Sequence, residues 1–372
     1  MNPLPVDIDP HRRACLRALA LAAGVGAGLT WPRAARAASE PLATADATDA
    51  PNAADAVGAA GPVPAGLAVD WDWVDVQRQR AVPVRLYWPQ RPEGAVASRS
   101  VPLVVFSHGI GGSRLGYSYL GRHLASQGWA CLHVQHVGSD RALWFGNPFS
   151  LVSRLRRAAQ ESEAIHRVKD IHFALDSLLD SALQHSALGP VAEAIDPGRI
   201  VMAGHSYGAN TSLLAIGARV ARAGQVFDFR DERFRAAILV STPPFYGEQD
   251  LPSILAAVQL PTLHITSNED VILIPGYRSG PEDRLALYEA MPDRRKGLVV
   301  FDRGSHSIFT DRMVSGGYEL NQDIKGATKM LATAFLRQQF ERDPAALAAW
   351  HERWQPIVAR TAGLAGAHDA KA

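Results

Sequence analysis

The chain has 372 residues, and 47% of them are hydrophobic, which is enough apolar material for a sizeable buried core. Its 38 basic and 37 acidic residues almost cancel, so the sequence has no strongly charged character that would favour binding to nucleic acid or to an acidic polymer. We therefore expect a small-molecule partner and no nucleic-acid partner.

Residues 1–37 resemble an export signal of the twin-arginine type. Arg12 and Arg13 precede an apolar run of alanine, glycine and leucine, and the sequence ARA at residues 35–37 fits an A-x-A cleavage site. The uncharged run over residues 18–31 is shorter than the ~20 residues that span a bilayer, which disfavours the alternative of a membrane anchor. We expect a periplasmic or secreted protein with no stable membrane insertion after the signal is cleaved.

The residues after this signal divide into a leader and a domain. Residues 38–66 are rich in alanine, aspartate and proline and contain no aromatic residue, so we expect a disordered leader. Residues 67–372 show no internal repeat and no second core, which predicts one domain. Cys131 is the one cysteine after the signal and lies in an apolar run, so we expect a buried thiol without an internal disulfide.

The predicted domain alternates short apolar runs with segments whose apolar residues recur at spacings of three and four. The runs predict buried strands at residues 82–89, 101–109, 129–137, 199–206, 234–242, 261–270 and 297–306. The other segments predict helices at residues 114–127, 158–183, 210–222 and 321–340. Regular alternation of this kind predicts an α/β fold, with a mostly parallel twisted sheet covered by helices on both faces.

One serine lies between two glycines at the end of an expected strand. The sequence Gly204-His205-Ser206-Tyr207-Gly208 fits G-x-S-x-G, in which a strand turns sharply into a helix and projects the serine hydroxyl outward. The apolar run before the motif and the helical segment after it match this context. We therefore predict that Ser206 is a nucleophile rather than a residue of an ordinary turn.

A serine hydroxyl needs a base, and the base needs a carboxylate to orient it. His306 follows the last expected strand in a Gly/Ser loop, so it should lie at the same edge of the sheet as Ser206. His205 adjoins Ser206, but neighbouring side chains on a sharp turn diverge, so we do not expect it to be the base. Asp270 follows a strand and gives the chain order Ser, Asp, His; Glu269 remains an alternative acid.

Two backbone amides are candidates for binding the oxyanion of a tetrahedral intermediate. The amide of Tyr207 lies at the start of the expected helix, where free N–H groups and the helix dipole favour negative charge. The amide of Ile110 lies in a glycine-rich loop after an early strand. Phosphate binding by this loop is disfavoured, since it has neither the P-loop lysine nor the G-x-G-x-x-G order.

Residues 141–160 contain several aromatic and basic residues between an expected strand and the next helix. They read as an insertion over the strand ends, either a lid or pocket wall or a loop packed on the surface. Trp144 and Phe145 are candidate pocket residues in this segment, and Phe245 and Tyr246 are candidates for the opposite wall. These segments do not distinguish a short acyl ester, a lipid or a polyester, and the oligomeric state is left open.

The predicted domain resembles the α/β-hydrolase superfamily. The stretches VVFSHGIGGSRLGYSYLGRHLASQGW, RVKDIHFALDSLL and GHSYGANTS are similar to bacterial relatives of plasma-type platelet-activating-factor acetylhydrolase, often labelled dienelactone-hydrolase-like. The resemblance implies hydrolysis of carboxylic esters with no metal or organic cofactor. It also implies Ser206 as nucleophile, His306 as base, and the amides of Ile110 and Tyr207 as oxyanion donors.

The sequence departs from these relatives at two points. Dienelactone hydrolases have a cysteine where this chain has Ser206, so their substrate does not carry over. In the acetylhydrolases the acid follows the strand after the nucleophile helix, but AAILVSTPPF has no carboxylate there, and Asp270 lies one strand later. A serine peptidase or amidase and a catalytically silent binding module on the same fold remain alternatives.

Overall fold

The computed structural model describes most of the predicted domain. The described residues are 68–89, 100–179, 189–222, 224–245, 250–274, 277–313 and 315–364. The predicted export signal, the predicted leader and Tyr246 lie outside them. Among the described residues, no helix has the length and apolar character needed to cross a membrane.

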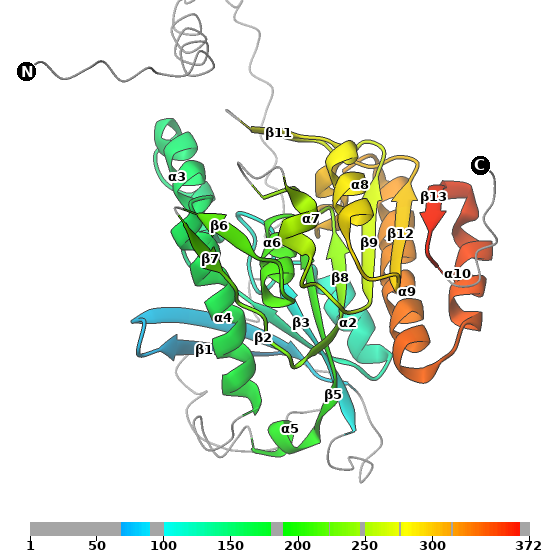
Figure 1. Cartoon of the computed structure of the whole chain (residues 1–372), viewed down its shortest axis with the longest axis horizontal. Helices are drawn as coiled ribbons and strands as arrows, with labels where there is room; N and C mark the ends of the chain where they lie inside the picture. Colours follow the sequence, from blue (N-terminus) through cyan, green and yellow to red (C-terminus); the bar gives the residue numbers. More distant parts are fainter. Residues whose placement is uncertain are drawn as a thin grey trace, which may run out of the picture. The chain divides into compact units, whose positions relative to one another are not determined.

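A nine-stranded sheet forms the centre of the domain, in the order β1-β2-β4-β3-β5-β8-β9-β12-β13 (Figure 1). The six strands from β4 to β12 in this order pair in parallel, whereas the pairings β1–β2, β2–β4 and β12–β13 at the two edges are antiparallel. The expected mostly parallel sheet is therefore confirmed. The strands are β1 (Ala68–Asp75), β2 (Arg80–Tyr87), β3 (Val101–Ser107), β4 (Ala130–Val134), β5 (Ile195–His205), β8 (Phe234–Val240), β9 (Thr262–Ser267), β12 (Lys296–Phe301) and β13 (Val358–Ala362).

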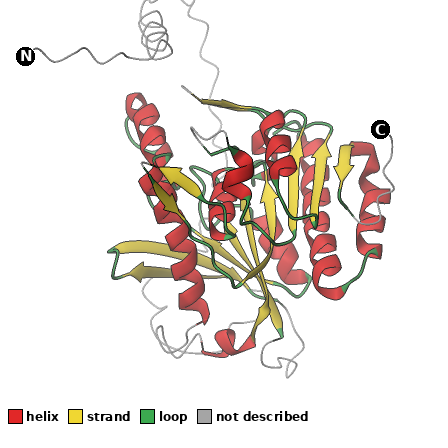
Figure 2. Ribbon diagram, in the orientation of Figure 1, coloured by secondary structure: helices red, strands yellow, loops and turns green. Residues whose placement is uncertain are grey.

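Helices lie on both faces of the sheet (Figure 2). The helices are α2 (Ser118–Ser126), α3 (Leu151–Ala158), α4 (Glu161–Leu179), α5 (Gly189–Ala194), α6 (Tyr207–Ala215), α7 (Leu251–Leu255), α8 (Pro281–Ala290), α9 (Tyr318–Glu341) and α10 (Ala345–Trp354). The part of the chain that the structure describes also contains four single turns of 3-10 helix, η1 (Arg141–Trp144), η2 (Pro148–Ser150), η3 (His306–Phe309) and η4 (Gln355–Ile357). Two small antiparallel ribbons pair β6 (Val220–Arg222) with β7 (Gln225–Phe227), and β10 (Ile272–Ile274) with β11 (Tyr277–Ser279).

The core has two halves, one on each face of the sheet, and β3 contributes to both. Leu103 and Val105 pack in the half that contains α4, α6 and α8, whereas Val104 and Phe106 pack in the half that contains α2, α9 and α10. Successive side chains of a strand point to opposite faces, so a strand that is covered on both faces must be apolar at every position. This requirement explains the continuous apolar run that predicted the strand. Cys131 is likewise buried in β4 as a free thiol.

The expected helix at residues 210–222 is wrong in its second half. Helix α6 ends at Ala215, and residues 220–222 form β6 instead. Gly217 has a φ of 116°, a backbone conformation that glycine adopts far more readily than other residues and that does not continue a right-handed helix. The apolar spacing continued through this point, but the glycine ends the helix.

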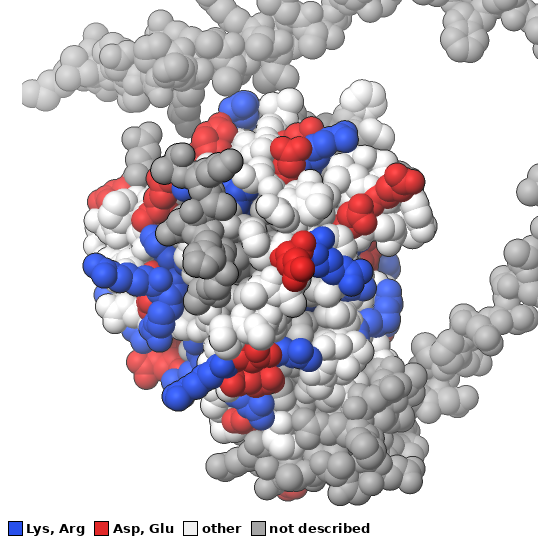
Figure 3. Space-filling view, turned by 90° about the vertical axis from the view of Figure 1, so that its right-hand side faces the viewer, with Lys and Arg blue, Asp and Glu red and all other residues white. Residues whose placement is uncertain are grey.

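Charged side chains of both signs are interspersed on the face of the molecule in Figure 3. This mixture agrees with the nearly equal numbers of basic and acidic residues in the sequence.

Candidate active site

Ser206 occupies a sharp turn between the end of β5 and the start of α6. Its φ of 56° and ψ of −124° lie in a region that residues other than glycine rarely adopt, at a cost on the order of 1–3 kcal/mol. A Cβ added to Gly204 would collide with the backbone of Gly208, and a Cβ on Gly208 would collide with the carbonyl oxygen of Ser107. The turn that projects the Ser206 hydroxyl therefore requires both glycines.

The structure brings Ser206, His306 and Asp270 into one chain of hydrogen bonds. His306 begins η3 just after β12, and its Nε2 lies 2.7 Å from Ser206 Oγ. Its Nδ1 lies 2.7 Å from Oδ1 of Asp270, which follows β9. The Asp270 side chain is fully buried, whereas that of His306 is 20% exposed. A hydroxyl, an imidazole and a carboxylate from three strand ends are therefore in direct contact.

The surroundings of Asp270 keep its carboxylate ionised. Thr266 Oγ1 donates a hydrogen bond to Oδ2 at 2.7 Å, and Arg284 Nε lies 3.4 Å from the same oxygen. Burial raises the pKa of Asp270, but the hydrogen bond from His306 and the nearby positive charges outweigh this effect and hold the pKa well below its ordinary value. An ionised Asp270 accepts the Nδ1 proton of His306, so Nε2 is free to accept the Ser206 proton.

Glu269, the alternative acid, has different contacts. Its Oε2 accepts a hydrogen bond from the Gly304 amide at 3.0 Å, and its Oε1 lies 4.0 Å from Arg303 Nε. The Glu269 side chain is 55% exposed. Of the two adjacent carboxylates, Asp270 is the one that bonds to His306.

The loop that follows β3, residues 108–112, lies against Ser206. A Cβ added to Gly109 would be 3.3 Å from Ser206 Cβ. The Gly111 amide donates to the Ser139 carbonyl at 2.8 Å, and the Gly112 amide donates to the Gly109 carbonyl at 3.0 Å. This second bond orients the peptide between Gly109 and Ile110, whose N–H points opposite to its C=O.

The Ile110 amide itself donates to no acceptor within the described residues. The amide of Tyr207, the first residue of α6, also donates to no acceptor within the described residues. Further along the helix, the amides of Ala209 and Asn210 donate to the Ser206 carbonyl. Amides at the first turn of a helix carry partial positive charge that favours an anion. The unpaired N–H groups of Ile110, in the loop that lies against Ser206, and of Tyr207, the residue after Ser206, are therefore candidates to bind a developing negative charge.

A buried arginine that the sequence did not reveal as a site residue supports both segments. Arg167 on α4 is fully buried, and its guanidinium carbon lies 4.4 Å from the centroid of the Tyr207 ring. The same guanidinium donates to the carbonyl of His108 and, at 2.8 Å, to Ser139 Oγ. Burial lowers the pKa of Arg167 to about 10, so the group remains a cation at neutral pH. The sequence signal that could have identified Arg167 is its position, as a charged residue, on the apolar face of the expected helix at residues 158–183.

A second serine, histidine and aspartate set lies beneath this loop. Ser107 Oγ is 2.9 Å from His136 Nε2, and His136 Nδ1 is 3.1 Å from Oδ2 of Asp170. All three side chains are fully buried, and burial lowers the pKa of His136 to about 3. With no access for a substrate, this set serves as a structural anchor at the end of β3.

The predicted pocket residues fall in different surroundings. Trp144 Nε1 donates a hydrogen bond to the Gly111 carbonyl at 2.8 Å, so Trp144 lies beside residues 108–112. Phe145 is 70% exposed, whereas Phe245 is partly buried against the core. The segment thus adjoins one side of the candidate site.

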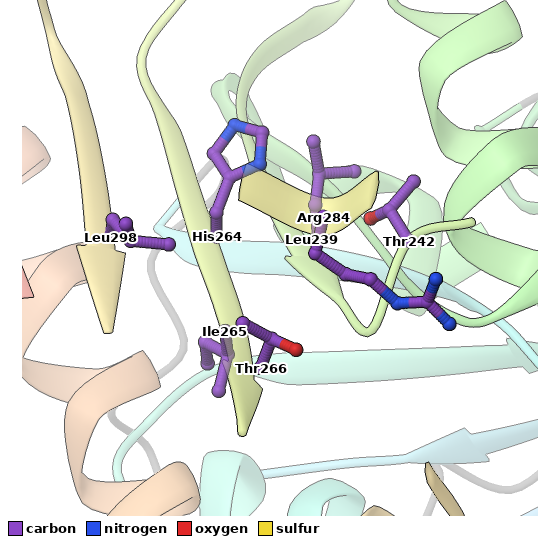
Figure 4. A pocket seen from close by; sticks show the side chains of 7 residues that line it. All are labelled: Leu239, Thr242, His264, Ile265, Thr266, Arg284 and Leu298. Atoms are coloured by element: carbon purple, nitrogen blue, oxygen red, sulfur yellow. The ribbon is translucent and has the colours of Figure 1, made fainter. Parts of the chain in front are cut away.

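A narrow pocket is lined by side chains of β8, β9, β12, α8 and the residue Thr242, and two of them, Thr266 and Arg284, also contact Asp270 (Figure 4). It leaves no room for the centre of a water molecule, so it is a packing gap rather than a substrate site. Its lining residues are Leu239, Thr242, His264, Ile265, Thr266, Arg284 and Leu298.

Known proteins resemble the chain in sequence and in fold. A model of the family described as platelet-activating factor acetylhydrolase, isoform II, matches residues 74–144. The platelet-activating factor acetylhydrolase of Canis lupus familiaris is 29% identical over 164 residues, covering 37% of this chain and 34% of the dog protein. That of Bos taurus is 24% identical over 239 residues, covering 56% of this chain and 48% of the bovine protein. The matches thus span less than half the length of either relative.

A solved structure of a ferulic acid esterase from Streptomyces cinnamoneus has a similar fold. The TM-score is 0.54 at 19% sequence identity, over 76% of this chain and 93% of the esterase. At this identity the likeness concerns the fold alone. Together with the parallel sheet and its two layers of helices, it identifies the fold as that of the α/β hydrolases.

Proposed function

We propose that this chain, which has the α/β-hydrolase fold and is similar in sequence to platelet-activating factor acetylhydrolases, is a serine hydrolase of carboxylic esters with short acyl or lipid-like groups. The observation that carries the proposal is the unbroken hydrogen-bond path from Asp270 through His306 to Ser206, with 2.7 Å on either side of the imidazole. The strained backbone of Ser206 supports the proposal, because strain of this kind is typical of a residue that must present its side chain for catalysis.

In the first step, Ser206 Oγ attacks the ester carbonyl carbon. His306 Nε2 accepts the hydroxyl proton as the new C–O bond forms, and Asp270 stabilises the resulting imidazolium. The carbonyl oxygen becomes an oxyanion that the amides of Ile110 and Tyr207 bind. When the tetrahedral intermediate collapses, His306 returns the proton to the leaving alkoxide, which departs as an alcohol and leaves an acyl group on Ser206.

In the second step, water replaces the alcohol. His306 removes a proton from the water as it attacks the acyl carbon, and the same two amides bind the second oxyanion. Collapse of this intermediate breaks the bond to Ser206 Oγ, which takes its proton back from His306. The products are a carboxylic acid, an alcohol and the unchanged enzyme.

The kinetics of Ser206→Ala test this proposal. We expect the variant to lower kcat on a p-nitrophenyl ester by a factor on the order of 10⁴ or more, because the nucleophile is lost. Ser212→Ala is the matched control, since Ser212 is a buried serine on α6 whose hydroxyl donates to the Gly208 carbonyl at 2.9 Å. Wild-type turnover in Ser206→Ala would refute the role of Ser206, and faster turnover of a matched anilide than of the ester would favour an amidase.

The proposal includes export of the protein. The twin arginines and the A-x-A site in residues 1–37 support a periplasmic or secreted location. Replacing Arg12 and Arg13 by lysine should retain the protein in the cytoplasm of an expressing bacterium, and unchanged export would count against a twin-arginine signal.

A further inference from the structure

Two buried side chains next to the candidate site form hydrogen bonds that reach the loop after β3 at one end and the backbone of His306 at the other. Tyr117, just before α2, and His205, the last residue of β5, are 5% and 3% exposed. Tyr117 Oη lies 2.8 Å from His205 Nδ1, and it accepts a hydrogen bond from the Gly109 amide at 3.3 Å. His205 Nε2 lies 3.1 Å from the carbonyl oxygen of His306. The bonds thus run from the loop after β3 to the backbone of the base.

For each hydrogen bond in this path, only one of the two groups can be the donor. A carbonyl oxygen only accepts, so His205 Nε2 carries the proton and donates to the His306 carbonyl. Burial lowers the pKa of His205 to about 3, so the ring is neutral and its Nδ1 has no proton. Nδ1 must therefore accept from the Tyr117 hydroxyl, whose oxygen is left to accept from Gly109. The chemistry of the four groups fixes the direction of all three hydrogen bonds.

The path joins segments that are far apart in the sequence. Gly109 lies after β3, His205 ends β5 and His306 follows β12, so the sheet alone does not fix the two loops relative to each other. The rings of His205 and His306 also pack with their centroids 4.8 Å apart. Tyr117 itself has a φ of 58°, a strained conformation for a residue other than glycine, and its hydroxyl is held in the path.

The path holds the N–H of Gly109, which belongs to the peptide before the one that carries the amide assigned to the oxyanion. A shift of either loop changes the distance between the oxyanion donor and the base that serves Ser206. Misplacement by about 1 Å costs an enzyme on the order of 100-fold in rate. The three bonds therefore act where small displacements have large effects.

We propose that Tyr117 and His205 are positioning residues, which together link the oxyanion loop (residues 108–112) to the backbone of the catalytic base. The link rests on the proposed function, since it has a kinetic effect only if Ser206, His306 and the Ile110 amide catalyse acyl transfer. Within the described residues, neither side chain hydrogen-bonds to Ser206 Oγ or to the ring nitrogens of His306.

Three single variants break the link at different bonds. Tyr117→Phe removes one hydroxyl and keeps the ring. His205→Gln retains a donor at the position of Nε2 and loses the acceptor for Tyr117, because the glutamine amide lies at the outer end of the side chain. His205→Asn retains an acceptor at the position of Nδ1 and loses the donor to His306. Tyr288→Phe is the matched control, a buried tyrosine on α8 whose ring packs against His264.

The variants are compared by kcat and KM on a p-nitrophenyl ester, with active sites counted by a fluorophosphonate. We expect each of the three to lower kcat about tenfold while KM changes less than about twofold, which is the pattern of an interaction realised in the transition state. Tyr288→Phe should keep the wild-type kcat. Residues that only filled space would lower the fraction of folded protein and leave kcat per active site unchanged.

A double variant tests whether the bonds act as one link. Tyr117→Phe with His205→Asn should lower kcat by the same factor as either change alone, because loss of any one hydrogen bond already uncouples the loop from the backbone of His306. Wild-type kcat per active site in the single variants, or a double variant whose loss is the product of the two, would overturn the link while leaving the proposed function in place. A wild-type protein that hydrolyses no ester and is not labelled would overturn the proposed function and the link with it.

Discussion

Replacing Asp270 by asparagine tests the identity of the acid and leaves its shape almost unchanged. The carboxylate lies 2.7 Å from His306 Nδ1 and accepts its proton. An asparagine amide can turn its NH₂ group toward Nδ1, which favours the tautomer with the proton on Nε2. That tautomer cannot accept the proton of Ser206, whose hydroxyl is 2.7 Å away. Loss of the correct tautomer lowers kcat by about 10⁴, or about 5.5 kcal/mol in activation free energy.

The assay is the hydrolysis of a p-nitrophenyl ester by Asp270→Asn, with Glu269→Gln as the matched control. Glu269 has the same charge and adjoins Asp270 in sequence, but its carboxylate bonds to the Gly304 amide. We expect the control to keep kcat within about threefold of wild type, since a half-exposed carboxylate contributes little. A large loss of kcat in Glu269→Gln with little loss in Asp270→Asn would refute the reasoning and assign the acid to Glu269.

Three further predictions concern stability. Gly208→Ala should lower the free energy of unfolding by about 3 kcal/mol, because the added Cβ meets the Ser107 carbonyl, whereas Gly116→Ala should be tolerated because its nearest contact is 3.4 Å; urea unfolding compares the two. Arg167→Met should cost at least about 3 kcal/mol in the same measurement, because several buried acceptors lose a charged donor, and an unchanged midpoint would contradict this. Asp270 has a pKa held below its ordinary 3.8, so its contribution to stability is present above about pH 4 and is lost as the pH falls toward the folded-state pKa; Asp270→Asn should flatten this part of the stability profile.

The central part of the fold follows from the sequence because its strands are buried on both faces. The runs that contain β3, β4, β5, β8, β9 and β12 are mostly apolar, and each was predicted as a strand. The outer strands β1 and β13 were not predicted, since partly exposed edge strands mix polar and apolar residues. Helices α8 and α10 were missed as well. Helix α8 has a local signal that the sequence analysis did not use, because Pro281 begins the helix and Glu282 and Asp283 lie in its first turn.

The candidate site is predictable to different degrees for different residues. Ser206 carries a local motif, and His306 follows a strand in the expected chain order, so sequence indicates both. Asp270 and Glu269 are neighbours in one loop, and only the direction of their side chains distinguishes them. Tyr117 has no local signal at all, because its role depends on a contact with His205 that the sequence separation of 88 residues conceals.

Peptide mapping after treatment with a fluorophosphonate tests the activation of Ser206 most directly. The reagent reacts with a serine whose hydroxyl is activated by a neighbouring base, so its site of attachment reports which hydroxyl that is. We expect a single phosphonyl group on the peptide that contains Ser206, and a labelling rate reduced by orders of magnitude when His306 is replaced by alanine. Labelling of folded protein at another residue, or labelling of Ser206 at an unchanged rate without His306, would contradict the account.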